Sequence, residues 1–275
     1  MLMLKTEVIC LCFCYTHGMN PQGLLSLTFN TEQAKIEFRK AIEQLPAEVD
    51  MYIVGGVIRN ALIKEFHGQV LIQRDYDQVI TKGTVFYEEY LRKQGFEEHP
   101  YPSMQDVQTV YRKPLFKGEL KEDYHDWIVF DMHTVDGTTI EDNLRNSVGF
   151  TINGCAIKGN DILTKPWQEA LIQTLPTAIK DIKDKKLRVN LNGYKNQPSI
   201  FFAALRFMSV GFSAPSPEEV NLLLKELPNL EHARFDRNVR KVWDYVGGED
   251  KARGLVKELG IDIDVFNEDV VKSKL

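Results

Sequence analysis

The sequence predicts an α+β protein in which a mixed domain of strands and helices is followed by an all-helical domain. Up to about residue 133, short apolar segments bounded by glycine or polar residues alternate with segments of helical period. After residue 198 the apolar segments have helical spacing, and strand signals have faded. We therefore expect an N-terminal extension with one helix (1–47), a mixed domain (48–190) and a helical domain (191–275).

Composition narrows the class of protein. A chain of 275 residues has room for one large or two ordinary domains, and its 43% hydrophobic and 27% charged residues exclude long disorder. No apolar run approaches the roughly 20 residues of a membrane-spanning helix, so we expect no membrane partner. The net charge of -5 argues against coating nucleic acid through bulk charge. It leaves room for a local basic groove.

The cysteines predict neither a disulfide framework nor a zinc site. Cys10, Cys12 and Cys14 alternate along an extended apolar segment and Cys155 stands alone, without the paired spacing of zinc ligands. A reducing compartment, the cytoplasm, is therefore expected. The first 18 residues lack the basic start and the small-residue cleavage site of a secretory segment.

The first elements form a strand, a glycine turn and a helix. A helix at 32–45 ends at Pro46, a strand at 51–54 leads into Gly55 and Gly56, and a helix follows at 57–66. Further strands are expected at 76–81, 106–112 and 127–133, and a helix at 85–94.

The second half contains one more apolar stretch, at 150–157, and then helical signals. A segment at 198–212 is apolar at helical spacing. Ser216 and Glu219 form a capping box with Pro217 at the first helical position, which opens a helix at 220–227. Helical windows at 237–246 and 250–259 complete the expected elements.

Asp75 and Asp77 are the first candidate site residues. Residues two apart on a strand point the same way, so both carboxylates project from one face. Adjacent carboxylates repel unless a cation lies between them, and hard oxygen ligands suit Mg²⁺. Taken alone, the pair is more typical of a solvated strand edge than of a metal site.

The glycine pair upstream supports a phosphate-binding site. Gly55 and Gly56 lie between a strand and a helix, where backbone N–H groups can approach an anion closely. Arg59, one turn into the helix, adds a charged donor. A plain tight turn is the alternative explanation.

These motifs resemble those of a known family. The segment 52–63, followed by 74–77, is similar to the opening signature of class II tRNA nucleotidyltransferases (CCA-adding enzymes) and bacterial poly(A) polymerases, in the polymerase-β-like superfamily. Segments 143–153, 178–189, 197–207, 235–242 and 256–260 resemble later motifs of the family, in the family's order. The resemblance covers about residues 50–268.

The resemblance implies a head domain with a small mixed sheet, a helical neck and a metal-dependent reaction. In that reaction an RNA 3′-hydroxyl attacks the α-phosphate of a nucleoside triphosphate and pyrophosphate leaves. It implies Asp75 and Asp77 as ligands of Mg²⁺ and Asp131 as a third catalytic carboxylate. A strand-end aspartate beside His133 is an equally open interpretation of Asp131. The nucleotide would be bound by Gly55, Gly56, Arg59, Arg145, Asn153, Gln197 and Arg206.

The sequence departs from the family's pattern where the family holds its nucleotide. An arginine pair and an aspartate are replaced by 147–149, with Arg145 as a substitute after a one-residue shift. In the neck, Gln197, Ile200 and Ala203 replace charged residues, and Arg206 remains. Since a charge-assisted hydrogen bond contributes about 1.5–3 kcal/mol, base selection should be altered.

Two functions follow from this comparison. One is a nucleotidyltransferase that acts on an acceptor hydroxyl, such as a tRNA-like RNA 3′ end, with altered base selection. The other is a catalytically silent relative that binds nucleotide or RNA, or serves as a partner subunit. The family's body and tail domains, which grip tRNA, have no counterpart in the chain, so a protein partner could supply that recognition. A basic run at 183–188 could face RNA phosphates or simply solvent.

Overall fold

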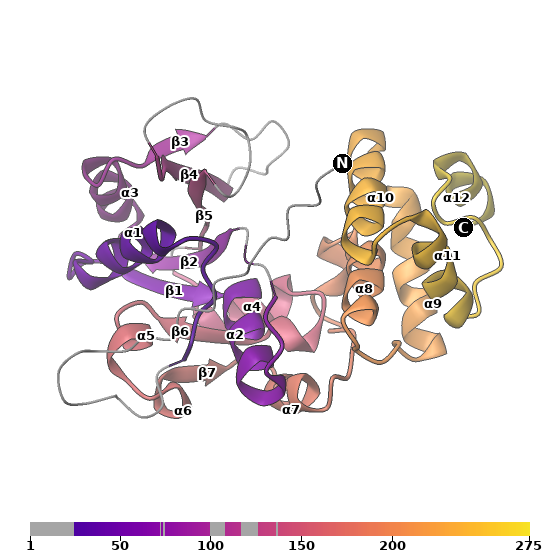
Figure 1. The fold of residues 1–275 in the computed structure, drawn as a ribbon, viewed down its shortest axis with the longest axis horizontal. Helices are drawn as coiled ribbons and strands as arrows, with labels where there is room; N and C mark the ends of the chain where they lie inside the picture. Colours follow the sequence, from indigo (N-terminus) through magenta and orange to yellow (C-terminus); the bar gives the residue numbers. More distant parts are fainter. Residues whose placement is uncertain (1–24, 72, 74, 100–107, 117–125, 136) are drawn as a thin grey trace, which may run out of the picture. The chain divides into compact units, whose positions relative to one another are not determined.

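The computed structural model describes residues 25–71, 73, 75–99, 108–116, 126–135 and 137–275. The chain forms two compact units (Figure 1): one holds the residues up to Asn143 together with Cys155–Thr174, and the other holds Leu144–Gly154 and Leu175–Leu275. The domain limits expected at residues 47 and 190 stay predictions. The first 18 residues, which include Cys10, Cys12 and Cys14, lie outside the described residues. So do the first two residues of the strand expected at 106–112.

The first unit is built on a mixed sheet of seven strands in the order β3-β4-β5-β2-β1-β6-β7. Neighbouring strands are antiparallel except β2 and β5, which run parallel. The strands are β1 (Asp50–Val54), β2 (Tyr76–Lys82), β3 (Glu97–His99), β4 (Gln108–Pro114), β5 (Trp127–Thr134), β6 (Cys155–Lys158) and β7 (Leu171–Gln173).

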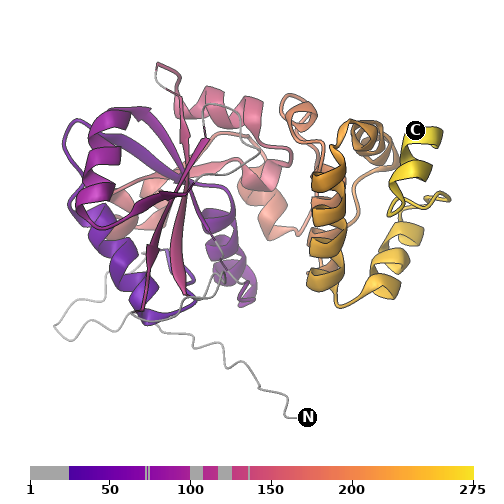
Figure 2. The same cartoon turned by 90° about the horizontal axis from the view of Figure 1, so that it is seen from above.

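Helices pack on the sheet and connect its strands (Figure 2). α1 packs against β5, and α2 against β1, β2 and β6. Thr31 caps α1 by accepting the Ala34 N–H at 3.0 Å, which satisfies one of the free donors of the first turn. The helices of this part are α1 (Glu32–Glu43), α2 (Gly56–His67), α3 (Thr84–Lys93), α5 (Asp161–Thr164) and α6 (Trp167–Ala170), and α4 (Ile140–Ser147) spans the boundary between the units.

The two faces of β2 have different neighbours because side chains alternate along a strand. Tyr76 packs on Phe38 of α1 with ring centroids 4.9 Å apart, and Gln78 accepts the Tyr87 hydroxyl of α3 at 2.8 Å. Asp77 faces the other way, towards the start of α2. The strand thus keeps an aromatic core on one side and a polar site on the other.

The second unit is helical and has its own aromatic core. Phe202 of α8 meets Phe235 of α10 edge to face at 5.5 Å, and both side chains are fully buried. Its helices are α7 (Ala178–Lys183), α8 (Ile200–Ser209), α9 (Pro217–Glu226), α10 (His232–Val246), α11 (Glu249–Glu258) and α12 (Glu268–Lys274), with 3₁₀ turns η1 (Thr151–Asn153), η2 (Tyr194–Asn196) and η3 (Leu227–Asn229).

The α+β class is confirmed, and so are most of the long elements. The capping box forms, with Ser216 Oγ accepting from Glu219 N at 3.3 Å and Glu219 accepting from Ser216 N at 2.9 Å. Within the described residues no helix has the length and apolar character needed to cross a membrane.

Two expectations are corrected. The apolar stretch at 150–157 holds a 3₁₀ turn followed by the short strand β6. Strands do not end there, since β7 pairs with β6. The helix expected at 250–259 is not the last one, because α12 follows it. Asn267 caps α12 with its side-chain oxygen, and the Val271 side chain of α12 is fully buried.

Candidate active site

Three carboxylates meet on the polar side of β2 and β5. Asp75 immediately precedes β2, Asp77 lies within it, and Asp131 lies on β5 directly opposite Asp77 in the parallel pairing. Each of the three offers an oxygen, and these oxygens lie within 4.8 Å of one another. The sequence predicted the first two as a pair, and the strand pairing brings in the third.

The glycine turn packs directly on this cluster. Gly55 ends β1 with φ +63°, a conformation that side chains disfavour, and a Cβ at this position would lie 2.8 Å from Asp77 Oδ2. Gly56 begins α2 and donates its backbone N–H to the same oxygen at 3.3 Å. Two glycines in sequence thus let the start of α2 approach a carboxylate closely.

The cluster is electrostatically crowded. Burial raises the pKa of Asp77 well above its ordinary value, and the charges of Asp75 and Asp131 raise it further. The Gly56 N–H and the Arg59 guanidinium act in the opposite direction. Burial also lowers the pKa of His133, whose Nε2 lies 3.9 Å from Asp131. Carboxylates that repel each other in this way are poised to take up a cation.

Hard divalent cations fit this donor set. Mg²⁺ prefers carboxylate oxygens and is commonly held by one or two carboxylates together with a substrate's phosphates. Asp75 and Asp77 would hold such an ion, with Asp131 beside them. The observation behind this fit is the convergence of three carboxylate oxygens in a half-buried site.

A polar network that the sequence did not reveal supports Arg59 and Asp75. Arg59 donates to Asn60 Oδ1 at 3.0 and 3.2 Å, and Asn60 Nδ2 donates to Gln73 Oε1 at 3.0 Å. The Gln73 amide in turn donates to the backbone carbonyl of Asp75. Asn60 and Gln73 are buried. In the sequence, only their position beside the motifs indicated a role for these two residues, because single Asn and Gln residues form no recognisable motif.

The other predicted nucleotide-binding residues lie in the helical unit. Gln197 donates its amide to the Ser147 carbonyl at 2.8 Å, two residues beyond Arg145 on α4. The carbonyl of Arg145 accepts from Asn190 Nδ2 at 2.8 Å, while its side chain is exposed. The segments around 145 and 197 are therefore tied together, and one N–H of Gln197 is already used.

Gly149 and Ile200, at two positions where the sequence departs from the pattern it resembles, pack against each other. Ile200 is 1% exposed, and a Cβ on Gly149 would lie 2.2 Å from Ile200 Cδ1 and 2.9 Å from Gln197 Oε1. A glycine and an isoleucine thus pack where the family pattern has charged residues. The two changes belong together, since only glycine leaves room for this isoleucine.

Asn153 ends η1, and a buried aspartate fixes the start of that turn. Asp181 accepts the Thr151 hydroxyl at 2.7 Å and the Thr177 hydroxyl at 2.6 Å, and Arg188 Nε lies 3.3 Å away. Asp181 was not predicted as a positioning residue. Arg206 lies on α8, half-buried.

Sequence comparison alone does not assign the chain to a family. No known family model matches it, and no curated protein does.

The fold is a mixed sheet with helices followed by a helical region, and solved CCA-adding enzymes are similar to it. A CCA-adding enzyme with ATP matches at a TM-score of 0.54 and 19% identity, over 83% of this chain and 49% of that one. The Thermotoga maritima CCA-adding enzyme in complex with tRNA matches at 0.54 and 17%, over 84% of this chain and 50% of the other.

A tRNA-processing enzyme in an apo form matches at 0.51 and 20%, over 88% of this chain and 60% of the other. This chain spans about half the length of the first two structures. At these identities the likeness establishes the fold.

Proposed function

We propose that this protein is a metal-dependent nucleotidyltransferase that transfers a nucleoside monophosphate from a nucleoside triphosphate to the hydroxyl of an RNA 3′ end. The observation that carries the proposal is the joint position of Asp75, Asp77 and Asp131 beside the Gly55–Gly56 turn. Solved structures of the same fold contain ATP, CTP or tRNA. These support nucleotide and tRNA-like RNA as substrates.

The proposed reaction is a substitution at the α-phosphorus of the nucleoside triphosphate. The acceptor oxygen forms a bond to the α-phosphorus, the bond from that phosphorus to the bridging oxygen breaks, and pyrophosphate leaves. The hydroxyl proton passes to a carboxylate, for which Asp131 is the candidate because it lies opposite Asp77. Mg²⁺, when bound, neutralises charge on the phosphates.

Arg59 and the turn amides would bind phosphate oxygens. Arg59 points its guanidinium near Gly56, since a Cβ on that glycine would lie 3.4 Å from Arg59 Nη2. The Gly56 N–H now bonds Asp77. If Asp77 held a cation instead of accepting this hydrogen bond, the Gly56 N–H would be available to a phosphate oxygen.

Selection of the base should differ from that of an enzyme that has charged hydrogen-bonding side chains at the positions of Gln197 and Ile200. Ile200 and Gly149 offer only packing, and the Gln197 amide retains hydrogen-bonding atoms beyond the one used. We therefore propose relaxed or altered choice among nucleotides, with Arg145, Asn153 and Arg206 as the other nucleotide-binding residues.

The test is label transfer from each of the four α-labelled nucleoside triphosphates to a tRNA pool with trimmed 3′ ends, in the presence of Mg²⁺. Asp77→Asn should abolish transfer, and the exposed helix residue Asp250 provides a matched control as Asp250→Asn. Label transfer that survives Asp77→Asn would contradict the assignment. Absence of transfer from every nucleotide, with binding that is indifferent to Mg²⁺, would instead identify a silent binding protein.

A further inference from the structure

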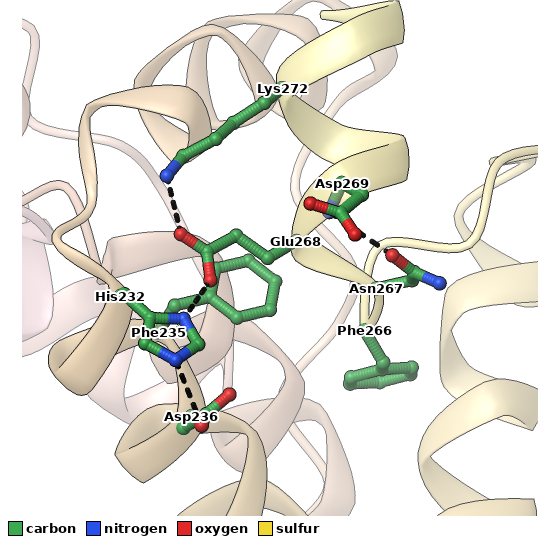
Figure 3. A pocket seen from close by; sticks show the side chains of 8 residues that line it. All are labelled: His232, Phe235, Asp236, Phe266, Asn267, Glu268, Asp269 and Lys272. Carbon is green, nitrogen blue, oxygen red and sulfur yellow. Dashed lines mark hydrogen bonds and ion pairs between the residues drawn. The ribbon is translucent and has the colours of Figure 1, made fainter.

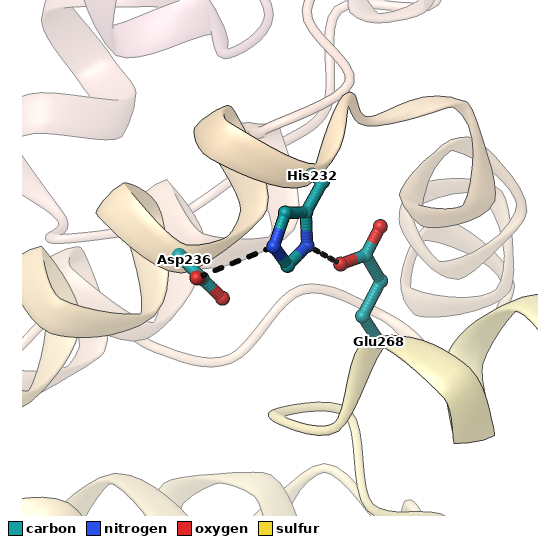
Figure 4. Close-up of side chains that lie close together, drawn as sticks. All are labelled: His232, Asp236 and Glu268. Carbon is teal, nitrogen blue, oxygen red and sulfur yellow. Dashed lines mark hydrogen bonds and ion pairs between the residues drawn. The ribbon is translucent and has the colours of Figure 1, made fainter.

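A second cluster of metal-ligating side chains lies in the helical unit, well separated in sequence from the carboxylates of the sheet. His232 and Asp236 come from the first turns of α10, and Glu268 comes from the first turn of α12. One ligand atom from each lies within 4.8 Å of the other two (Figure 4). No part of the proposed transfer reaction uses them.

The three side chains line a surface cavity of about 340 Å³ (Figure 3). Phe235 and Phe266 form its apolar part, and Lys272 closes one side. His232 is 76% exposed, so the imidazole is open to solvent and to ions. The cavity has room for the waters that complete a coordination sphere.

The distances around the imidazole distinguish its two nitrogens. Nδ1 of His232 is in close hydrogen-bond contact with Glu268 Oε2, whereas Nε2 lies 3.8 Å from Asp236 Oδ2. A separation of 3.8 Å is too long for a hydrogen bond. It suits two ligands that each lie about 2.0–2.2 Å from a shared ion.

The contact with Glu268 prepares the ring for that role. Metal-binding histidines usually donate their other ring N–H to a carboxylate, which fixes the tautomer and the ring orientation. With the proton on Nδ1, the Nε2 lone pair is directed towards Asp236. His232 and Asp236 are four residues apart on α10, which places them on one face of the helix.

The two carboxylate oxygens of Glu268 have different partners. Its Oε1 contacts Lys272 Nζ at 2.5 Å, and its Oε2 contacts His232. Asp236 faces the imidazole, with its Oδ2 3.8 Å from His232 Nε2. The hydrogen bond to Glu268 and the two nearby carboxylates raise the pKa of His232. A divalent cation would therefore bind Nε2 in competition with a proton, with Asp236 beside it and the Glu268 carboxylate behind the ring.

We propose that His232 Nε2 and Asp236 bind a divalent transition ion of the zinc class, with Glu268 as the residue that orients the imidazole. Imidazole nitrogen favours zinc-like ions over Mg²⁺, whereas the all-carboxylate cluster of the sheet favours Mg²⁺. The ion would fix His232 against Asp236 on α10, and the hydrogen bond between His232 Nδ1 and Glu268 links the site to the start of α12.

The experiment measures Zn²⁺ binding by calorimetry and by the shift in melting temperature, on the full chain. The background is Asp75→Asn/Asp77→Asn, so that the cluster of the sheet does not contribute. We expect one Zn²⁺ per chain and a melting temperature that rises with Zn²⁺ concentration. His232→Gln can still hydrogen-bond to Glu268, and it should abolish both effects.

Two further variants separate an ion site from an ion-pair contact. Glu268→Gln should weaken Zn²⁺ binding by about tenfold or more, as loss of an orienting group does. Lys272→Gln removes a competing positive charge and should tighten binding. Asp269→Asn, which removes a carboxylate from the same cavity without touching His232, should leave binding within about twofold.

A structural ion pair gives a different pattern. In that case the variants at His232 and Glu268 would lower the melting temperature equally with and without Zn²⁺, and calorimetry would detect no His232-dependent binding. Either result would overturn the proposal. Neither readout depends on transferase activity, so the outcome is independent of the proposed function.

Discussion

Asp77 and Asp131 lie directly opposite each other on the parallel strands β2 and β5. The remaining neighbours in the sheet are antiparallel, so β2 and β5 form the one parallel pair among the described strands. Both side chains lie on the face turned away from the aromatic core, because Tyr76 and Phe130, their strand neighbours, pack with Phe38. The register alone therefore brings together carboxylates that are 54 positions apart in the sequence.

Neutralising Asp77 should stabilise the metal-free protein while it removes activity. Asp77→Asn keeps an acceptor for the Gly56 N–H and removes one of three charges that lie within 4.8 Å. We expect the free energy of unfolding in EDTA to rise by about 1 kcal/mol, measured by urea denaturation. Addition of Mg²⁺ should stabilise the wild type more than the variant. Equal stabilisation of both would show that the cluster does not bind the ion.

Gly55→Ala should impair the site through both its backbone and the space around it. Gly55 and Gly68 both have positive φ, +63° and +65°, but ψ is -127° at Gly55 and 5° at Gly68, so only Gly68 lies in the left-handed helical region. A Cβ at Gly55 would also meet Asp77 at 2.8 Å, whereas one at Gly68 would meet nothing within 4 Å. Gly68→Ala should cost about 1–2 kcal/mol of stability. Gly55→Ala should cost more and displace Asp77.

Urea denaturation and Mg²⁺ affinity measured on both glycine variants check this expectation. Gly68→Ala should keep the wild-type affinity. If Gly55→Ala also kept it, the close approach of the turn to Asp77 would have no role in the site.

Gln73→Leu should break the network that links Arg59 to Asp75. It leaves the Nδ2 of buried Asn60 and the Asp75 carbonyl without the partners that Gln73 provides. An unsatisfied buried polar group costs about 1–3 kcal/mol, and the loss should appear in urea denaturation. Mg²⁺ affinity should fall as well, because Asp75 loses its backbone anchor. Gln44→Leu, at an exposed position after α1, is the matched control. A variant with lower stability but unchanged Mg²⁺ affinity would limit Gln73 to a structural role.

Glu37 should make the first unit sensitive to acid. Burial alone raises the pKa of this carboxyl, but Lys113 and Lys40, at 2.6 and 3.1 Å, together lower the pKa below its ordinary value of 4.5. A lowered pKa means that the charged form stabilises the folded state. That contribution is present above the ordinary pKa and is lost as the pH falls through the lower, folded-state pKa.

Urea denaturation of Glu37→Gln between pH 7 and pH 3 tests this dependence. The stability of the variant should be lower than that of the wild type at pH 7, and the two curves should converge as the pH falls below 4.5. Parallel curves over the whole range would contradict the expectation.

Local sequence signals predicted the elements whose stability is local. The Ser216–Glu219 capping box, the Gly55–Gly56 turn and the alternation around Asp77 depend on neighbours within a few residues, and each forms as expected. The three-residue strands β3 and β7 were missed because their sequences carry too few residues to show a period, and pairing with β4 and β6 decides them.

The sequence by itself determined the α+β class, the pairing of Asp75 with Asp77 at the start of a strand and the helical character of the second half. Only the tertiary structure decided that Asp131 joins Asp77, that Gln73 and Asn60 support Arg59, that Ile200 fills the space left by Gly149, and that His232 meets Glu268. The reason is physical: periodicity and capping act over one or two turns, whereas strand register and helix packing bring together residues that no local interaction relates.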